Sequence, residues 1–235
     1  MTLREQAFRT AALGLLAAAF PQSRSDAQVS TVDEGSFTIS RGSTRVGRES
    51  FLIRRNTGAG GETYLSTATI DLDSRKLTPV LRTDSALVPL LYQLDIKQGD
   101  QTELSLKGAV GRGRFTAQVR TAKGESSREY LVSDQAMLLD EDIFHQYALL
   151  AQRLGNSGGT VPVVVPQKNV QITLTAKVAE GEPLMIARTS IPTRHYVATA
   201  ADGATREFWT DTRGRLLKVA IEPAGLTALR DQPPR

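Results

Sequence analysis

Apolar and polar side chains alternate along most of this chain. In the clearest stretch the apolar positions are Val170, Ile172, Leu174, Ala176 and Val178, with glutamine, threonine and lysine between them. A strand points successive side chains to opposite faces, so this pattern gives one apolar and one polar face. It is typical of an antiparallel sheet with one face buried and the other in water.

About eleven segments follow this pattern and are separated by glycine, aspartate, serine or proline turns. Residues 37–55 predict a hairpin around Gly42 and Gly47, and residues 89–98 (PLLYQLDIKQ) predict a further strand. The chain from residue 28 to residue 235 therefore predicts one mainly β domain.

Residues 140–159 break the alternation and predict a helix over 141–154. Asp140 is the expected N-cap, with two acidic residues after it, and Gly155 is the expected C-cap. The apolar positions of this segment recur at helical spacing and form a wide stripe: Ile143, Phe144, Tyr147, Ala148, Leu150, Ala151 and Leu154.

So wide a stripe needs a broad apolar partner. The inner face of a curved sheet is the simplest one, because every other segment has strand periodicity. The predicted fold class is a mainly β protein with a strongly curved antiparallel sheet or half-open barrel of about eleven strands. One helix packs on its concave side.

The first 27 residues have the layout of a secretory signal peptide. Arg4 and Arg9 precede an apolar run of about ten residues, and the segment ends in small residues at Ser25 and Ala27. A membrane anchor is the alternative, but a span needs about 20 apolar residues. We expect cleavage near Ala27 and a soluble periplasmic or secreted protein.

Charge and cysteine content narrow the classes of partner. The net charge is +4, and removal of residues 1–27 lowers it to +3 because three arginines and two acidic residues leave. The basic residues are not clustered, so we expect no nucleic-acid partner. Cysteine is absent, which argues against a lipidated anchor, disulfides and a thiolate metal site.

The closing stretch, residues 206–230, contains the only tryptophan, Trp209, beside several arginines. Asp211 and Gly214 fit a turn between two alternating arms, which predicts the last hairpin of the sheet. The alternative is that Trp209 lines the mouth of a binding site.

Few residues suggest catalysis or metal binding. His145 and His195 are isolated from ligands at metal spacing, so we expect no metal and no cofactor. The three glycines of residues 108–114 lie between two strand patterns rather than before a helix, so a hairpin explains them better than a phosphate loop. Composition leaves a Ser–His–Asp triad open, but no GxSxG turn is present, and we expect no enzyme.

Three segments carry a resemblance to known proteins: FTISRGSTRVGRESFLIRR at 37–55, VVPQ at 164–167 and FWTDTRGRLLKV at 208–219. With the order of signal, hairpin, meander, helix and hairpins, the chain resembles an uncharacterised family of exported bacterial proteins with a curved antiparallel sheet. That architecture is similar to periplasmic lipoprotein carriers and related lipid-binding half-barrels. The resemblance implies a fold and supplies no catalytic residues.

Two functions from different classes remain. The first is an exported soluble binding protein, a carrier or chaperone for a lipid or other apolar ligand, with Phe144, Tyr147, Leu150 and Trp209 as ligand-binding residues. The second is a non-catalytic structural or interaction protein of the cell envelope, whose barrel is filled by its own helix. An apolar cavity of several hundred Å³ would favour the first function, and a packed interior the second.

Overall fold

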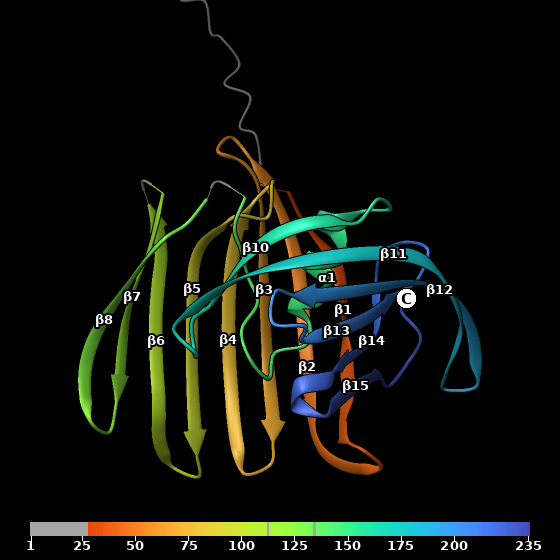
Figure 1. Ribbon diagram of the computed structural model, residues 1–235, viewed down its shortest axis with the longest axis horizontal. Helices are drawn as coiled ribbons and strands as arrows, with labels where there is room; N and C mark the ends of the chain where they lie inside the picture. The colour runs from red at the N-terminus through yellow and green to blue at the C-terminus, as the bar shows by residue number, and fades with distance from the viewer. Residues whose placement is uncertain (1–27, 112, 134) are drawn as a thin grey trace, which may run out of the picture.

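The computed structural model describes residues 28–111, 113–133 and 135–235. The predicted signal peptide, residues 1–27, lies outside the described residues. Within these ranges the chain forms one sheet of fifteen strands, one α-helix and one short 3-10 helix (Figure 1). The fold class predicted from the alternation is confirmed, with more strands than the expected eleven.

The first half of the sheet is a meander of eight strands. They are β1 (Gln28–Arg41), β2 (Thr44–Gly58), β3 (Gly61–Leu72), β4 (Arg75–Asp84), β5 (Pro89–Gln98), β6 (Gln101–Gly111), β7 (Arg114–Thr121) and β8 (Gly124–Leu131).

The second half begins just before the helix α1 (Gln146–Leu154) and continues after it. Its elements are β9 (Met137–Leu138), β10 (Gly159–Val165), β11 (Val170–Ile186), β12 (Thr189–Ala200), β13 (Thr205–Thr210), β14 (Leu216–Ile221), the 3-10 helix η1 (Glu222–Ala224) and β15 (Leu226–Arg230).

The two halves of the sheet join between β1, the first described strand, and β15, the last one. The sheet order runs from β8 to β1, then to β15 and on to β9, so β8 and β9 are the two edges. Strands β1 and β15 pair antiparallel, with Phe37 opposite Arg230. Only the β9–β10 pair among the described strands is parallel. The sheet is therefore open in its hydrogen bonding and curled in space.

The curl brings the second half across the concave side of the first. Figure 1 shows β10 to β14 running across the meander β3 to β6, with α1 between the two walls. Polar contacts link the β8 edge to the turn between β10 and β11. Arg128 donates to the carbonyl of Pro166, and the Tyr130 hydroxyl donates to Asn169.

Two of the observed strands, β8 and β9, have no period-two signal. In β8, only Tyr130 is buried, and β9 has two residues, both buried. The alternation of apolar and polar residues identifies a strand that has one buried and one solvent-exposed face. It cannot report an edge strand that is polar on both faces or a bridge of two residues.

The predicted helix start was wrong, and tertiary contacts explain the difference. The helix begins at Gln146, and Asp140 is not its N-cap. The Asp140 carboxylate instead accepts hydrogen bonds from the Tyr92 hydroxyl and from the backbone N–H of Gln167 and Glu141. Asp142 then adopts a left-handed backbone with φ of 60°, which is incompatible with a helical turn.

The predicted helix end is confirmed. Gly155 is the C-cap, with φ of 55°, and its N–H donates to the carbonyl of Ala151 at 3.0 Å.

Candidate functional site

Phe144, Tyr147 and Leu150, the predicted ligand-binding residues of the helical region, fill the space between the two walls. Phe144 and Leu150 are fully buried, and Tyr147 is 3% exposed. The Tyr147 ring lies 5.5 Å from that of Phe208 on β13. These side chains form core packing, so the deep interior is occupied by the protein itself.

Trp209 lies apart from these three residues. It follows Phe208 in β13 and therefore points to the opposite, outer face of the sheet. The His195 ring stacks on Trp209 with centroids 4.4 Å apart, and the Lys218 ammonium lies 4.4 Å from the ring centroid. The structure thus separates Trp209 from the other predicted site residues and holds it in a cross-strand stack.

Open space remains at the mouth of the curled sheet, beside the C-terminal part of α1. The hollow at this mouth holds 420 Å³. We call it the mouth cleft. Its lining comes from β1, β2, β3, α1, β12 and the β13–β14 turn: Val32, Asp33, Ile53, Arg55, Tyr64, Ala148, Leu149, Ala151, Gln152, Gly155, Asn156, Arg194, Tyr196, Thr212, Arg213, Gly214 and Arg215.

The inner part of the mouth cleft is apolar. Ile53 comes from β2, Ala148, Leu149 and Ala151 from α1, and Tyr196 from β12. All five are buried, since each belongs to the hydrophobic core at the point where that core reaches the cleft. An apolar ligand entering here would continue the core rather than rest on the surface.

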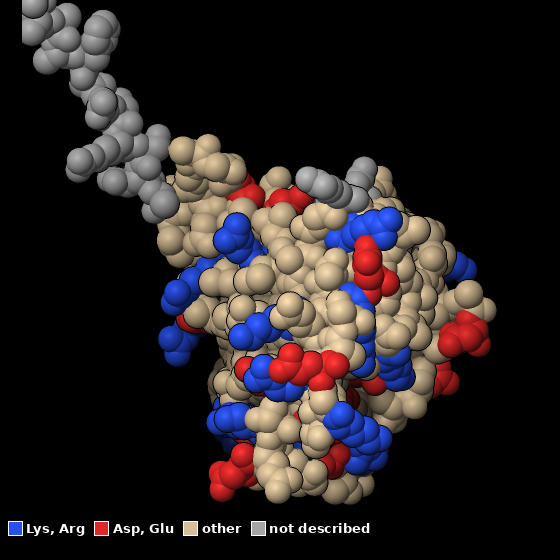
Figure 2. Space-filling model, turned by 90° about the vertical axis from the view of Figure 1, so that its left-hand side faces the viewer, with Lys and Arg blue, Asp and Glu red and all other residues tan. Residues whose placement is uncertain are grey.

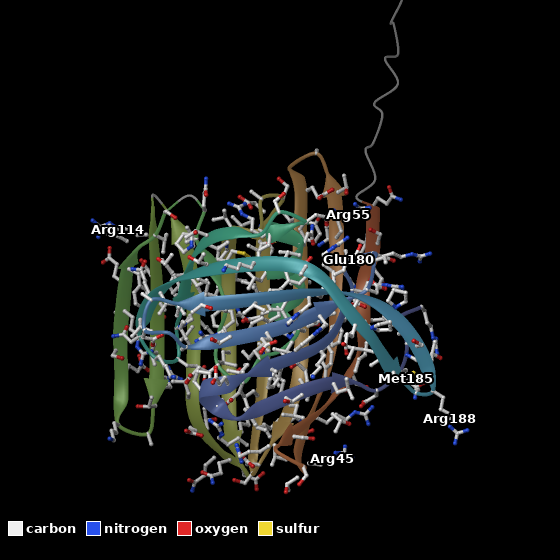
Figure 3. All side chains as sticks on the ribbon, turned by 45° about the vertical axis from the view of Figure 1, so that its right-hand side comes forward. Arg45, Arg55, Arg114, Glu180, Met185 and Arg188 are labelled. Atoms are coloured by element: carbon white, nitrogen blue, oxygen red, sulfur yellow. The ribbon has the colours of Figure 1, made fainter. Side chains whose placement is uncertain are left out.

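The outer part of the cleft carries four arginines: Arg55, Arg194, Arg213 and Arg215. Alternation places Arg55 on the same face of β2 as Ile53, and Arg194 on the same face of β12 as Tyr196. Figure 3 labels Arg55 near the end of its strand. Two arginines therefore occupy concave-face positions at the end of the barrel, where an apolar residue would be expected.

These arginines differ in how they are paired. Arg215 is held by Asp211, with Nη2 at 2.7 Å and Nε at 2.8 Å from the carboxylate. Arg55 lies 3.9 Å from Glu62. Among the described residues, no side-chain hydrogen bond or ion pair holds Arg194 or Arg213.

Tyr64 links the wall of the cleft to the helix. Its hydroxyl donates to Glu62 at 2.8 Å and accepts a hydrogen bond from Gln152 Nε2 at 2.9 Å. Burial, followed by the neighbouring Glu62, raises the pKa of Tyr64 above its ordinary value, so the phenol stays neutral. On the other wall the Tyr196 hydroxyl donates to the carbonyl of Gly155 at 3.1 Å. The helix end is thus fastened to both sides of the cleft.

A buried ion pair forms one end of the cleft. Arg230 donates through Nη1 and Nη2 to the two carboxylate oxygens of Asp33, at 2.9 and 2.8 Å. Burial raises the pKa of Asp33 above its ordinary value, and the bonds from Arg230 act in the opposite direction. The Arg230 guanidinium crosses Gly35, where an added Cβ would lie 2.9 Å from Nη2. Glycine at position 35 makes room for this pair.

Glu49 anchors the start of the helix, a role that was not predicted from the sequence. Its carboxylate accepts the backbone N–H of Phe144 at 2.8 Å and of His145 at 3.0 Å, and contacts His145 Nδ1 at 2.5 Å. Both side chains are fully buried. A signal was present, because Glu49 shares its strand face with Phe51 and Ile53, and a glutamate at such a position needs an internal partner.

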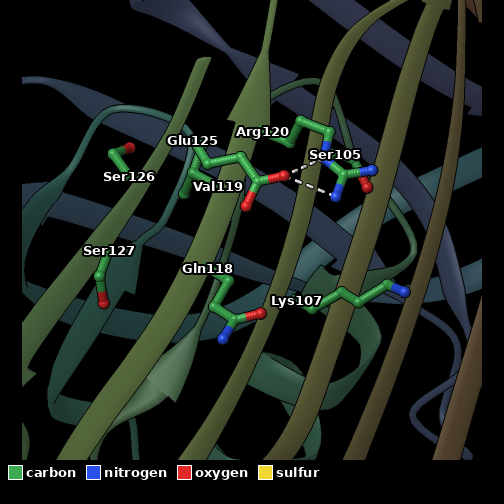
Figure 4. A pocket seen from close by; sticks show the side chains of 8 residues that line it. All are labelled: Ser105, Lys107, Gln118, Val119, Arg120, Glu125, Ser126 and Ser127. Atoms are coloured by element: carbon green, nitrogen blue, oxygen red, sulfur yellow. Dashed lines mark hydrogen bonds and ion pairs between the residues drawn. The ribbon is translucent and has the colours of Figure 1, made fainter.

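Other hollows are less suited to a ligand with both apolar and charged parts. A hollow of 380 Å³ over β6 to β8 is bordered by Lys107, Gln118, Arg120 and Glu125, and Arg120 is paired with Glu125 at 2.6 Å (Figure 4). The face on the β8 side of the molecule mixes acidic and basic side chains (Figure 2). The arginine of this hollow, Arg120, is thus neutralised by a neighbour in the same sheet.

Two further spaces adjoin the core. One of 620 Å³ lies between β1 and residues 232–235, and shares Val32, Asp33 and Arg215 with the mouth cleft. The other holds 170 Å³ beside Tyr147 and Arg206, away from the mouth. No group of three or more His, Cys, Asp or Glu residues that could hold a metal occurs in the described ranges. None of the helices in those ranges is long and apolar enough to cross a membrane.

Comparison with known proteins finds similarity at the level of solved structures. No family model and no curated protein matches the chain. A β-barrel-like protein of the domain of unknown function DUF1849 from Brucella abortus is similar, with 8% identity and a TM-score of 0.48. The match covers 84% of this chain and 93% of that chain.

Proposed function

We propose that this chain is an exported binding protein that holds a lipid or another amphipathic ligand in the mouth cleft. The observation that carries the proposal is the division of this cleft into an apolar inner part and an arginine-rich outer part. Core side chains such as Ile53 and Leu149 supply the first, and Arg194 and Arg213 supply the second.

The size of the cleft supports a small ligand. Its 420 Å³ lies within the range of about 300–1,000 Å³ that is usual for small-molecule sites. Its walls are fastened to each other through α1 by the hydrogen bonds of Tyr64 and Tyr196. A preformed site loses little conformational entropy on binding, which favours affinity.

Export is the second part of the proposal and rests on the layout of residues 1–27. N-terminal sequencing of the protein recovered from the periplasm or the medium tests it. A first residue at or near Gln28 is expected, and a first residue at Met1 would contradict export.

Titration with a fluorescent acyl probe tests whether the mouth cleft binds an apolar chain. Ala148→Leu adds three carbons to a side chain that lines the cleft, and should weaken probe binding because the apolar part becomes smaller. Ala179→Leu is the matched control, since Ala179 is exposed on β11. Equal probe affinity of both variants and the unchanged protein would place the probe elsewhere and contradict the proposal.

The interaction-protein alternative is favoured by one specific observation. Phe144, Tyr147 and Leu150 pack the interior, as expected for a barrel filled by its own helix. The same titration separates the two functions. Absence of binding by every acyl ligand would favour the interaction protein.

A further inference from the structure

The charges around the mouth cleft do not cancel. Asp33 is engaged by Arg230, and Asp211 by Arg215, so each of these pairs is close to neutral. Arg194 and Arg213 have no ion-pair partner among the described residues.

Arg55 adds to this excess. Its only ion-pair contact among the described residues is with Glu62, at 3.9 Å between half-exposed and one-third-exposed side chains. Such a pair contributes little at a protein surface. Glu180 lies opposite Arg194 in the β11–β12 register but forms no ion pair with it. The cleft therefore carries two to three guanidinium groups without a closely paired carboxylate among the described residues, beside an apolar floor.

Three separate elements supply these guanidinium groups. Arg55 comes from β2, Arg194 from β12 and Arg213 from the β13–β14 turn. Like charges brought to one cleft repel one another, and an anion bound between them removes that cost. Guanidinium groups are suited to oxyanions because their planar fork donates two parallel hydrogen bonds.

We propose that the head of the amphipathic ligand is a phosphate monoester, bound by Arg194 and Arg213 with Arg55 beside them. The inference rests on the proposed function, since it assigns the head of the same ligand. A carboxylate carries a single charge. A phosphate monoester carries about −1.5 to −2 at neutral pH and has three free oxygens, which match two or three arginines. The acyl chain then lies along Ile53, Ala148 and Leu149.

Calorimetric titration with ligands that share a dodecyl chain and differ in the head group tests which head group the cleft prefers. The ligands are dodecyl phosphate, dodecanoate and dodecylphosphocholine, each below the concentration at which it forms micelles, with inorganic phosphate as the fourth. Dodecyl phosphate should bind at least about tenfold more tightly than dodecanoate, which corresponds to one additional charge-assisted hydrogen bond. Inorganic phosphate should bind far more weakly, because it lacks the chain.

Variants of the cleft arginines test whether the preference for a phosphate head arises in the mouth cleft. Arg194→Gln and Arg213→Gln should each reduce the affinity for dodecyl phosphate by about tenfold and leave dodecanoate less affected. Arg213 is exposed in a turn, so its variant tests the head even where Arg194→Gln fails to fold. Arg188→Gln is the control, because Arg188 lies at the tip of the projecting β11–β12 hairpin (Figure 3).

The outcomes separate this inference from the proposed function. Equal affinity for dodecyl phosphate and dodecanoate would overturn the phosphate head and leave the amphipathic ligand standing. Failure of all three dodecyl ligands to bind would overturn the proposed function. If inorganic phosphate bound as tightly as dodecyl phosphate, the arginines would be a site for free phosphate. That result would overturn the proposal that the ligand is a lipid.

Discussion

Glu49 should be among the most sensitive positions of the fold, because it holds the start of α1 from inside the sheet. Its carboxylate accepts two backbone N–H groups, those of Phe144 and His145, and contacts the His145 ring. Glu49→Ala leaves both N–H groups buried without an acceptor. Each such group costs about 1–3 kcal/mol.

The ring of His145 also loses its partner in Glu49→Ala. Removal of one partner from a buried pair costs about 3–5 kcal/mol, so the free energy of unfolding should fall by about that amount. Glu49→Gln keeps the volume and one carbonyl oxygen, and should cost about half as much. Urea unfolding followed by circular dichroism gives both values.

A second Glu–His pair in the same protein is the matched control. Glu207 lies 2.7 Å from His195, but the two side chains are 40% and 25% exposed. Glu207→Gln should therefore change stability by less than about 1 kcal/mol. Equal small losses for Glu49→Gln and Glu207→Gln would refute the anchoring role of Glu49.

Three further predictions follow from burial. Burial raises the pKa of Asp140 to about 6, above its ordinary 3.8, so its protonated form favours folding. That stability is present below about pH 4 and lost as the pH rises through 6, by about 3 kcal/mol. Urea unfolding across this range should show the loss in the unchanged protein and not in Asp140→Asn; parallel profiles would contradict it. Leu150→Ala should lower the free energy of unfolding by about 2–5 kcal/mol, because Leu150 is fully buried. Gln152→Ala, which loses one hydrogen bond to Tyr64, should cost about 1 kcal/mol or less, and equal effects in denaturation would mean that the helix is not packed as described. Trp209 fluorescence should report unfolding and stay unchanged when a ligand fills the cleft, because the ring lies on the outer face; a large shift on titration would place the ligand there.

The sequence predicts the fold class because local periodicity carries it. One apolar face per strand, as in Leu174 and Ala176 of β11, shows which side of the sheet is buried. Gly155 ends the helix as expected because a C-cap depends on neighbouring residues alone. The start of the helix could not be predicted, since it depends on Glu49, which is 95 positions or more away along the chain.

The candidate site was predicted only in part for a related reason. Helix periodicity identifies Tyr147 and Leu150 as buried, but it cannot distinguish a packed core from a ligand cavity. The cleft depends on where β2, β12 and the β13–β14 turn meet, and no short segment contains Arg55 and Arg194 together. Arginines at concave-face positions near strand ends, such as Arg55 after Ile53, are the signal that could have indicated it.

Covalent labelling with a fatty acid that carries a photoreactive diazirine in its chain shows whether the ligand lies in the mouth cleft. After irradiation, peptide mass spectrometry locates the modified residues. Modification of Ile53, Ala148 and Leu149 is expected, and unlabelled dodecyl phosphate should compete it away. Modification centred on the outer face around Trp209, or spread over the sheet without competition, would contradict a ligand in the mouth cleft.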